Sequence, residues 1–391
     1  MIHYERDLMG KFPRTTAVVG VGATEISRNS GVPVGVLAAR AVRAAVEDAG
    51  LTLADVDAII DYQVGDSISA VALAASLGIR EFGWVEDVSG GGQHAASILG
   101  RAAMLVDSGV AEVVVVFRAL NGRTGKRMGQ TTVGLSDEGH FFAQYGLAGP
   151  PQLFALSATR FLHDRSMGPD DLAAVALQLR AHAVANPGAL MREPLDRAMY
   201  DASPYVAEPL RRLDCCQETD AACAVVVTRL DRARGGPHAP VVIRGVARGG
   251  GPGASSQDRA EDVAALFSRY VAGPLWRSAE MTSGDIDLAQ LYDAYTWVVL
   301  AQLEDFGFAE RGGAGQLIRS GGATYGGAIP VNTNGGLLSE GYVHGFNNVV
   351  EAIRQLRHEA GPRQVPDVAT ALVTGFSGSF GSAAVLTRAD A

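Results

Sequence analysis

An internal repeat constrains the fold of this chain more than any other feature. The segment Leu51–Asp57 (LTLADVD) is echoed by Met281–Asp287 (MTSGDID). Helical sequence precedes each copy, and a short apolar segment typical of a strand follows it. Two copies this far apart indicate a duplicated domain rather than a solenoid of short repeats. The 391 residues are enough for two halves with a large core.

Strand-like and helix-like segments alternate in both parts of the chain. Alternation of this kind favours mixed sheets covered by helices, and therefore an α/β fold. We expect an N-terminal half over residues 1–235 and a C-terminal half over residues 240–391. Within the first half, residues 121–209 are polar and loop-rich, with helical pieces near residues 157–163 and 170–185. This segment is expected to be an insertion on the αβ core that covers a ligand.

Charge and composition exclude several functions. The formal net charge of −9 argues against nucleic acid as a partner. Residues 1–14 lack an apolar core of signal-peptide length, and the apolar run Val113–Phe117 is too short to span a membrane. The three cysteines, Cys215, Cys216 and Cys223, form an odd and clustered set, which indicates free thiols and a cytoplasmic protein. No His/Cys spacing predicts a zinc site, and no metal is expected.

A glycine run precedes the most apolar helix of the first half. Ser89–Gly92 (SGGG) leads into residues 93–108, where Arg101 is the one fixed charge before Asp107. A helix that is apolar on nearly all sides is expected to be a buried central helix. The glycine turn would expose backbone N–H groups and the positive end of the helix dipole. The glycines are consecutive rather than spaced as G-x-G-x-x-G, so they do not predict a nucleotide site.

A second glycine-rich stretch carries two titratable rings. Residues 331–348 (VNTNGGLLSEGYVHGFNN) combine a strand-like start, a Gly-Gly turn and a helical end. Tyr342 and His344 lie two residues apart between Gly341 and Gly345. Glycine allows backbone conformations and close approaches that side chains forbid, so this turn is able to present both rings to a pocket. Taken alone, an exposed turn without a function is the simpler interpretation of these residues.

These features together resemble the thiolase superfamily. The resemblance rests on the duplicated halves, residues 213–228, the run NTNGG followed by a glycine-flanked turn, and the closing GFSGSFG of residues 375–381. It covers nearly the whole chain and is strongest to the thiolase-like lipid-transfer-protein branch, which includes bacterial aldolases that remove a side chain from steroid acyl-CoAs. It implies a duplicated αβαβα fold of five layers, usually a homodimer. The active site is then expected where the N-termini of two central helices meet.

Departures from the thiolase pattern change the expected chemistry. The position of the family's nucleophilic cysteine falls on Gly92, and that of its second, acid/base cysteine falls on Gly375. The family's active-site histidine is here Tyr342, and its oxyanion-binding asparagine or histidine is here Tyr292. Claisen chemistry through a covalent acyl-enzyme is therefore excluded unless another nucleophile serves.

A site with two phenols and no thiol suits retro-aldol cleavage of a β-hydroxyacyl-CoA. The substrate hydroxyl loses its proton, the bond to the α-carbon breaks, and a ketone and a thioester enolate form. The resemblance implies a 17-hydroxy steroid acyl-CoA as substrate, a 17-keto steroid and propionyl-CoA as products, and no cofactor beyond the CoA of the substrate. Two alternatives stay open: a non-catalytic subunit that binds acyl-CoA or sterol, and a thiolase with another nucleophile.

Four residues are the candidate catalysts. Tyr292 and Tyr342 form the acid/base pair, and the sequence does not decide which is the acid and which the base. A phenol has a pKa near 10 in water, so the base needs neighbours that lower its pKa. His344 and Asp293 are the nearest candidates for that support.

The remaining predictions concern substrate binding. Tyr295 matches a phenylalanine of the family and is expected in the wall of the pocket, and His94 is expected to face it. The N–H groups of Gly91 and Gly92 are candidates to hold the thioester oxygen. Gly375, like Gly92, leaves room where the family has a thiol.

The resemblance also bears on the free thiols and on partners. Cys215 and Cys216 lie on a segment that the family does not bring to the active site, so both are expected to pack as small apolar residues. The resemblance further implies a small companion protein with an OB fold, which in some relatives is fused to or associated with an acyl-CoA hydratase.

Overall fold

The computed structural model describes residues 12–125, 127, 137–147, 149–252 and 260–390. The N-terminal residues 1–11, part of the expected insertion and part of the loop after residue 248 lie outside the described residues. The strands of the main sheet are β1 Thr16–Ala23, β2 Ala58–Gln63, β3 Trp84–Ser89, β4 Val113–Asn121, β7 Asp220–Arg229, β8 Val241–Gly250, β9 Leu288–Gln290, β10 Thr370–Ser377 and β11 Phe380–Arg388. A small second sheet pairs β5 Tyr205–Ala207 with β6 Leu210–Arg211.

The helices are α1 Val34–Asp48, α2 Ala70–Leu77, α3 Ser97–Asp107, α4 Asp137–Ala143, α5 Pro150–Arg165, α6 Pro169–Ala185, α7 Arg197–Asp201, α8 Leu230–Ala233, α9 Ser268–Ala279, α10 Thr296–Asp305, α11 Ala314–Arg319, α12 Gly336–Ser339 and α13 Phe346–Leu356. Short 3₁₀ turns, which include η1 Leu53–Asp55, η2 Gly92–His94 and η7 Ser283–Asp285, connect several of them. Among the helices described, none combines the length and the apolar character needed to cross a bilayer.

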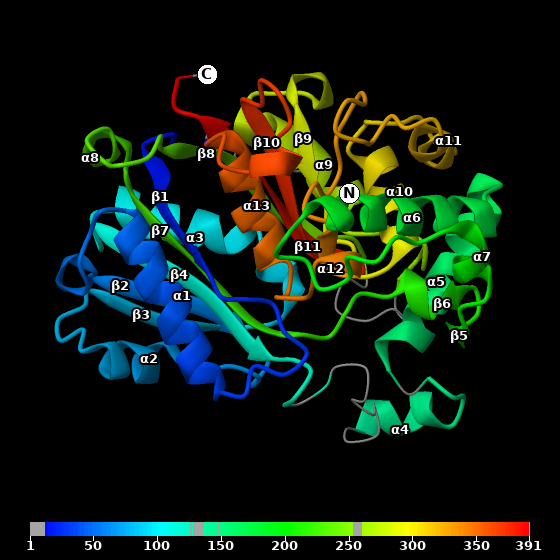
Figure 1. The fold of residues 1–391 in the computed structure, drawn as a ribbon, viewed down its shortest axis with the longest axis horizontal. Helices are drawn as coiled ribbons and strands as arrows, with labels where there is room; N and C mark the ends of the chain where they lie inside the picture. Colours follow the sequence, from blue (N-terminus) through cyan, green and yellow to red (C-terminus); the bar gives the residue numbers. More distant parts are fainter. Residues whose placement is uncertain (1–11, 126, 128–136, 148, 253–259, 391) are drawn as a thin grey trace, which may run out of the picture.

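The main sheet runs in the order β3-β2-β4-β7-β1-β8-β11-β10-β9 (Figure 1). Strands that come before residue 230 therefore occupy one side of it, and strands that come after residue 240 occupy the other. Only two residue pairs, Ala17 with Val242 and Val18 with Val241, join β1 to β8. The joint between the two groups of strands is thus much shorter than the ladders on either side of it.

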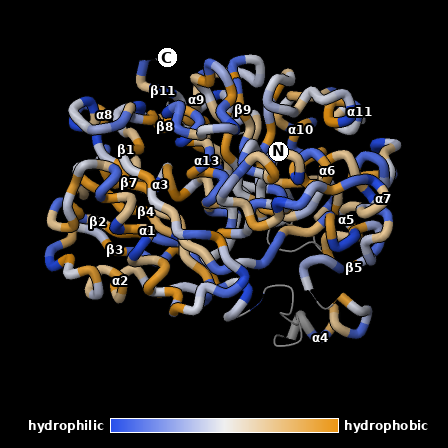
Figure 2. Tube along the Cα trace, in the orientation of Figure 1, coloured by the Kyte–Doolittle hydropathy of each residue, from blue (hydrophilic) through white to orange (hydrophobic). Residues whose placement is uncertain are grey.

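Alternating apolar side chains divide the molecule into layers. On β4, Val113 and Val115 pack with α1 and α2, whereas Val114 and Val116 pack with α3 and α13. The strands after residue 240 also turn one face to α3 and α13, and they turn the other face to α9 and α10. Successive strand residues point to opposite faces, so each group of strands is covered on both sides. The resulting order of helices, strands, central helices, strands and helices confirms the predicted five-layer fold (Figures 1 and 2).

The repeated heptapeptide has the same structural role in both halves of the chain. In each copy the threonine and the first aspartate form a capping box around a 3₁₀ turn, η1 in one and η7 in the other. The last aspartate accepts backbone N–H bonds at the start of the neighbouring parallel strand. Asp57 accepts from Val113 at 2.8 Å, and Asp287 accepts from Thr370 at 2.9 Å. The motif recurs because it starts two parallel strands in register.

The segment 121–209 is more helical than expected. The α5 and α6 helices take up much of it, and α6 is buried against α10, α11 and α12. The α6 helix matches the helical piece expected at residues 170–185. Its polar side chains are buried with partners: Arg180, for example, donates to the Ser339 hydroxyl at 3.2 Å. The expected boundaries of the two halves, and of this insertion, stay predictions.

Candidate active site

A cavity of about 510 Å³ lies where the N-terminal ends of the two central helices approach each other. Gly91 and Gly92 border it from the start of η2, ahead of α3. Tyr342 and His344 border it from the turn before α13, and Tyr292 borders it from the segment that follows β9. Helix N-termini direct backbone N–H groups and positive dipole ends outward, so this is a favourable place for a developing negative charge.

The structure brings the two predicted tyrosines together. The hydroxyl oxygens of Tyr292 and Tyr342 lie 2.9 Å apart, and the two rings meet edge to face. The backbone N–H of Tyr292 donates to the Thr374 hydroxyl at 2.7 Å, and its carbonyl accepts from the Gln302 amide at 2.9 Å. Tyr342 is held by Thr219, whose hydroxyl accepts from its N–H at 2.9 Å. Both phenols are thus positioned from the backbone.

Tyr292 occupies the space that a side chain at position 92 would need. A Cβ atom built on Gly92 would collide with the hydroxyl and ring of Tyr292, and one built on Gly345 would collide with the same ring. The two positions are therefore coupled: a tyrosine fits at position 292 because position 92 has no side chain. The phenol stands where a residue at the start of the first central helix would otherwise place its functional group.

His344 is a neutral hydrogen-bond donor to the cavity. Its Nδ1 lies 2.6 Å from Nη2 and 3.0 Å from Nε of Arg118. A guanidinium has only donors, so Nδ1 accepts and the proton of the neutral ring is on Nε2. Burial and the Arg118 charge lower the pKa of His344 to about 3, against the opposing effect of Asp66. The Nε2 edge of the ring lies beside Gly91, at the border of the cavity.

The phenols are not acidified by their surroundings. Burial raises the pKa of Tyr292 and of Tyr342 well above the ordinary value for tyrosine. The expected support from His344 and Asp293 is contradicted, because His344 is neutral and Asp293 is turned away from the cavity. The Asp293 carboxylate accepts backbone N–H bonds from Leu337 at 2.9 Å and Leu338 at 3.1 Å, which indicates a structural role at the start of α12.

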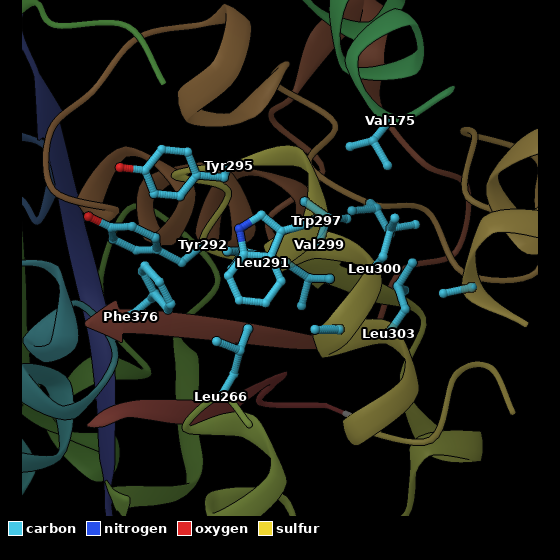
Figure 3. Packing of buried hydrophobic residues seen from close by; sticks show 14 of the residues in the cluster. Val175, Leu266, Leu291, Tyr292, Tyr295, Trp297, Val299, Leu300, Leu303 and Phe376 are labelled. Carbon is cyan, nitrogen blue, oxygen red and sulfur yellow. The ribbon is translucent and has the colours of Figure 1, made fainter. Parts of the chain in front are cut away.

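Tyr295 lies in the wall of the cavity, as expected. Its ring packs on Phe154 with centroids 5.4 Å apart, which brings α5 of the 121–209 segment to the site. Figure 3 shows the hydroxyls of Tyr292 and Tyr295 pointing the same way, away from Trp297 and the leucines behind them. The apolar core thus lies behind the two phenol rings, which border the cavity.

Two predicted binding residues lie elsewhere. His94 does not border this cavity; its Nε2 lies 3.1 Å from the Ser89 carbonyl oxygen, and the ring borders a separate cavity of about 190 Å³. Gly375 does not border it either. It is packed against the backbone of Gly92, since a Cβ at position 375 would collide with the Gly92 carbonyl. Its neighbour Phe376 borders the cavity instead. Gly375 is required by the close packing of β10 against η2, which sequence spacing did not reveal.

The prediction that Cys215 and Cys216 lie away from the site was wrong. Both border the cavity, because the N–H of Cys216 donates to the Ala294 carbonyl at 2.9 Å and Cys215 bridges to Tyr295. They also pack against the apolar core, as expected. Burial raises the pKa of Cys215 to about 12 and holds the pKa of Cys216 well above the ordinary value for a thiol, so both are neutral thiols at physiological pH.

Sequence reasoning missed the arginine that holds His344. Arg118 lies in β4 and is fully buried, with a salt bridge of 2.5 Å to Asp66. A single arginine inside the apolar strand Val113–Asn121 was the available signal, because a buried charge requires a dedicated partner. Arg127 and Glu218, which also border the cavity, pair at 2.5 Å. The described residues contain no group of three His, Cys, Asp or Glu side chains placed to hold a metal ion.

Several known proteins are similar to this chain over nearly its whole length. A steroid side-chain-cleaving aldolase of Thermomonospora curvata is 39% identical over 95% of this chain and 97% of its own length. A 17-hydroxy-3-oxo-4-pregnene-20-carboxyl-CoA lyase of Mycobacterium tuberculosis is 39% identical over 93% of this chain and 96% of its own length. The solved structure of an Ltp2-ChsH2(DUF35) aldolase matches with a TM-score of 0.90 and 36% identity, over 97% of this chain and 99% of that one.

The thiolase relationship extends beyond the aldolases. Residues 255–388 match the thiolase C-terminal domain-like family. Human mitochondrial 3-ketoacyl-CoA thiolase has a TM-score of 0.69 at 16% identity, which shows a common fold. The resemblance inferred from the glycine turns and the duplicated halves is therefore confirmed. The chain belongs to the thiolase-like family, with aldolases that cleave steroid side chains among its full-length relatives.

Proposed function

We propose that this protein is a carbon–carbon lyase that cleaves a β-hydroxyacyl-CoA by a retro-aldol reaction. The observation that carries the proposal is the bridged pair of phenols, 2.9 Å apart, in the space left by the absent side chain of Gly92. Such a site offers proton donors and acceptors but no nucleophile at the start of the central helix. The aldolase and lyase relatives, each 39% identical, support the same reaction class.

The two tyrosines act together as a proton relay. Because burial raises both pKa values, a free phenolate is disfavoured and coupled transfer is favoured. One tyrosine takes the proton of the substrate hydroxyl while it gives its own proton to the other tyrosine. The second tyrosine gives a proton to the α-carbon. The bond from the carbinol carbon to the α-carbon breaks, its electron pair stays on the α-carbon side, and both phenols end the turnover neutral.

The enolate oxygen of the departing thioester needs hydrogen-bond donors. The Nε2–H of His344 faces the cavity beside Gly91, and it is the side-chain donor best placed for this purpose. The backbone N–H groups of Gly91 and Gly92 remain candidates for the same oxygen, in agreement with their place at the N-terminal end of a helix. Donors that stay fixed before the reaction stabilise developing charge without the cost of reorganisation.

The substrate is a 17-hydroxy steroid acyl-CoA, which yields a 17-keto steroid and propionyl-CoA. The cavity suits such a molecule because Pro150, Pro151, Phe154 and Val206 give it apolar walls. Arg123 and Arg127 border the same cavity and pair with one carboxylate, that of Glu218, so positive charge predominates there and suits the phosphates of CoA. The relative named 17-hydroxy-3-oxo-4-pregnene-20-carboxyl-CoA lyase supports this substrate class.

The protein works in the cytoplasm as a homodimer with a small companion protein of the DUF35 type, which carries an OB fold. Support for the companion comes from the matching structure, whose name includes ChsH2(DUF35). Free thiols at Cys215, Cys216 and Cys223 support a reducing compartment. An acyl-CoA hydratase, fused to or associated with the companion, would supply the β-hydroxyacyl-CoA by adding water to an enoyl-CoA.

Product analysis tests the proposed function. The chain, alone and with the DUF35-type companion, is incubated with a 17-hydroxy steroid acyl-CoA. Release of the 17-keto steroid and propionyl-CoA in equal amounts is the expected result. Tight binding without products would instead support a non-catalytic binding subunit, and an acylated protein would support a thiolase with another nucleophile.

The neutral thiols of the wall lead to a separate expectation. The double variant Cys215→Ala/Cys216→Ala should keep kcat within about threefold of the wild type, because a thiol with a raised pKa holds little nucleophilic thiolate. Mass spectrometry of the wild-type protein during turnover should show no acyl adduct on either cysteine. An adduct that disappears in the double variant, together with its activity, would contradict the proton-relay mechanism.

A further inference from the structure

Arg118 contacts His344 with its charge held inside the protein. The side chain lies in β4 and is completely buried, and each of its three guanidinium nitrogen atoms donates to a specific partner. Nε and Nη2 donate to His344 Nδ1 at 3.0 and 2.6 Å, and Nη1 donates to the Ala119 carbonyl at 2.8 Å. Nη2 also reaches the Asp66 carboxylate at 2.5 Å, which compensates the charge. The guanidinium is therefore fixed against one edge of the imidazole.

The imidazole is held on its other sides as well. The backbone of His344 has a φ of +49°, and its carbonyl accepts from the Tyr62 hydroxyl at 2.9 Å. The Tyr62 ring stacks on the imidazole with centroids 6.4 Å apart, and the Tyr342 ring meets it edge on at 5.0 Å. The titratable or charged groups that face the imidazole are thus Arg118, Asp66, Tyr62 and Tyr342. A half-turn of the ring would put the Cδ2–H group in place of Nδ1 and lose the contacts to Arg118.

Only one protonation state of His344 fits this environment. A proton on Nδ1 would point at a group that has only donors, and an imidazolium would place a second positive charge against the guanidinium. The ring must therefore be neutral with its proton on Nε2, the edge that lies beside Gly91. Without the guanidinium, the nearest charged group to Nδ1 is the Asp66 carboxylate at 3.9 Å. A carboxylate would draw a proton to Nδ1.

We infer that Arg118, with Asp66 as its counter-ion, is a positioning residue that locks His344 in the Nε2–H tautomer so that the imidazole donates to the enolate oxygen. The inference rests on the proposed function, because the enolate oxygen formed in that reaction is the acceptor of the Nε2–H hydrogen bond. Arg118 itself does not border the cavity and acts through His344. An imidazole is often oriented by an aspartate, which accepts from Nδ1–H and leaves Nε2 as a base. A buried arginine instead donates to Nδ1, so the proton is on Nε2 and the ring acts as a donor.

The tautomer can be read directly by ¹⁵N NMR of histidine-labelled protein in the absence of substrate. The chain has eight histidines, and the signal that is lost in His344→Gln identifies the one in question. In the wild type we expect a neutral ring with a protonated Nε2 and a bare Nδ1, unchanged between about pH 5 and pH 9, where an ordinary histidine titrates. A proton on Nδ1, or a titration within that range, would overturn the inference even if no variant folded.

Variants then connect the tautomer to turnover. In Arg118→Met we expect a proton on Nδ1, a titration of His344 that moves into the measured range, and a loss of kcat of roughly a hundredfold with a smaller change in KM. Arg118→Lys keeps a donor-only cation and should retain the Nε2–H tautomer and part of the activity. If Arg118→Met loses activity but keeps the wild-type tautomer, its role is structural and the inference fails. If the tautomer behaves as expected in a protein that never cleaves the substrate, the proposed function fails and the tautomer lock stands.

Discussion

Tyr342→Phe is expected to lower kcat by roughly two or more orders of magnitude while the protein stays folded. The substitution removes one of the two hydroxyls that meet at 2.9 Å, so the proton of the substrate hydroxyl loses its path to the α-carbon. The ring itself is retained, with its edge-to-face contacts to Tyr292 and His344. The measurement is steady-state release of ketone and short acyl-CoA, with the thermal unfolding midpoint as a check on folding.

Tyr295→Phe provides the matched control for that experiment. It removes a phenol hydroxyl from the same cavity, but this hydroxyl has no hydrogen bond within the described part of the chain. A change in kcat of less than about tenfold is expected, because a wall residue contributes apolar contact rather than proton transfer. Near wild-type activity in Tyr342→Phe, or equal losses in both variants, would contradict the relay.

Gly92→Ala is expected to lower kcat by a similar factor, for a steric reason. The added methyl group would overlap the hydroxyl and ring of Tyr292, and Gly345 also lies close against this ring. The tyrosine must move or the start of the central helix must shift, and overpacking of this kind costs about 1–3 kcal/mol of stability. We expect a decrease in kcat of roughly two orders of magnitude together with that loss, measured by turnover and denaturant unfolding.

A double-mutant cycle with Tyr292→Ala isolates this collision. In the Tyr292→Ala background the space beside Gly92 is empty, so the stability cost of Gly92→Ala should largely disappear. Gly91→Ala is the matched control for folding, because its Cβ would meet the imidazole edge of His344 at 3.5 Å and Gln93 Oε1 at 3.6 Å, both ordinary contacts. Additive effects at positions 92 and 292 would show that the tyrosine does not occupy the space left at the helix start.

The site combines features that were predictable with features that were not. Tyr292 and Tyr342 stood out because each replaces a functional residue of a recognisable family pattern, and the structure brings them into contact. Their catalytic roles remain predictions. Asp293 was chosen because it follows Tyr292 in sequence, yet adjacent residues at a turn point in different directions, and its carboxylate caps α12. Neighbours in sequence are weak guides to neighbours in a pocket.

The sequence by itself determined the fold class, the duplication and the loss of the thiols. The alternation of apolar residues and the repeated heptapeptide are local or repeated patterns, so they can be recognised along the chain. The missing thiols were inferred from the resemblance to the thiolase pattern. Only the tertiary structure decided which groups face the cavity and in which protonation state. Arg118 meets His344 across 226 positions, and Cys216 enters the cavity wall through a backbone bond to Ala294. Burial, which depends on every layer of the fold at once, then raises the pKa of the phenols and lowers that of the imidazole.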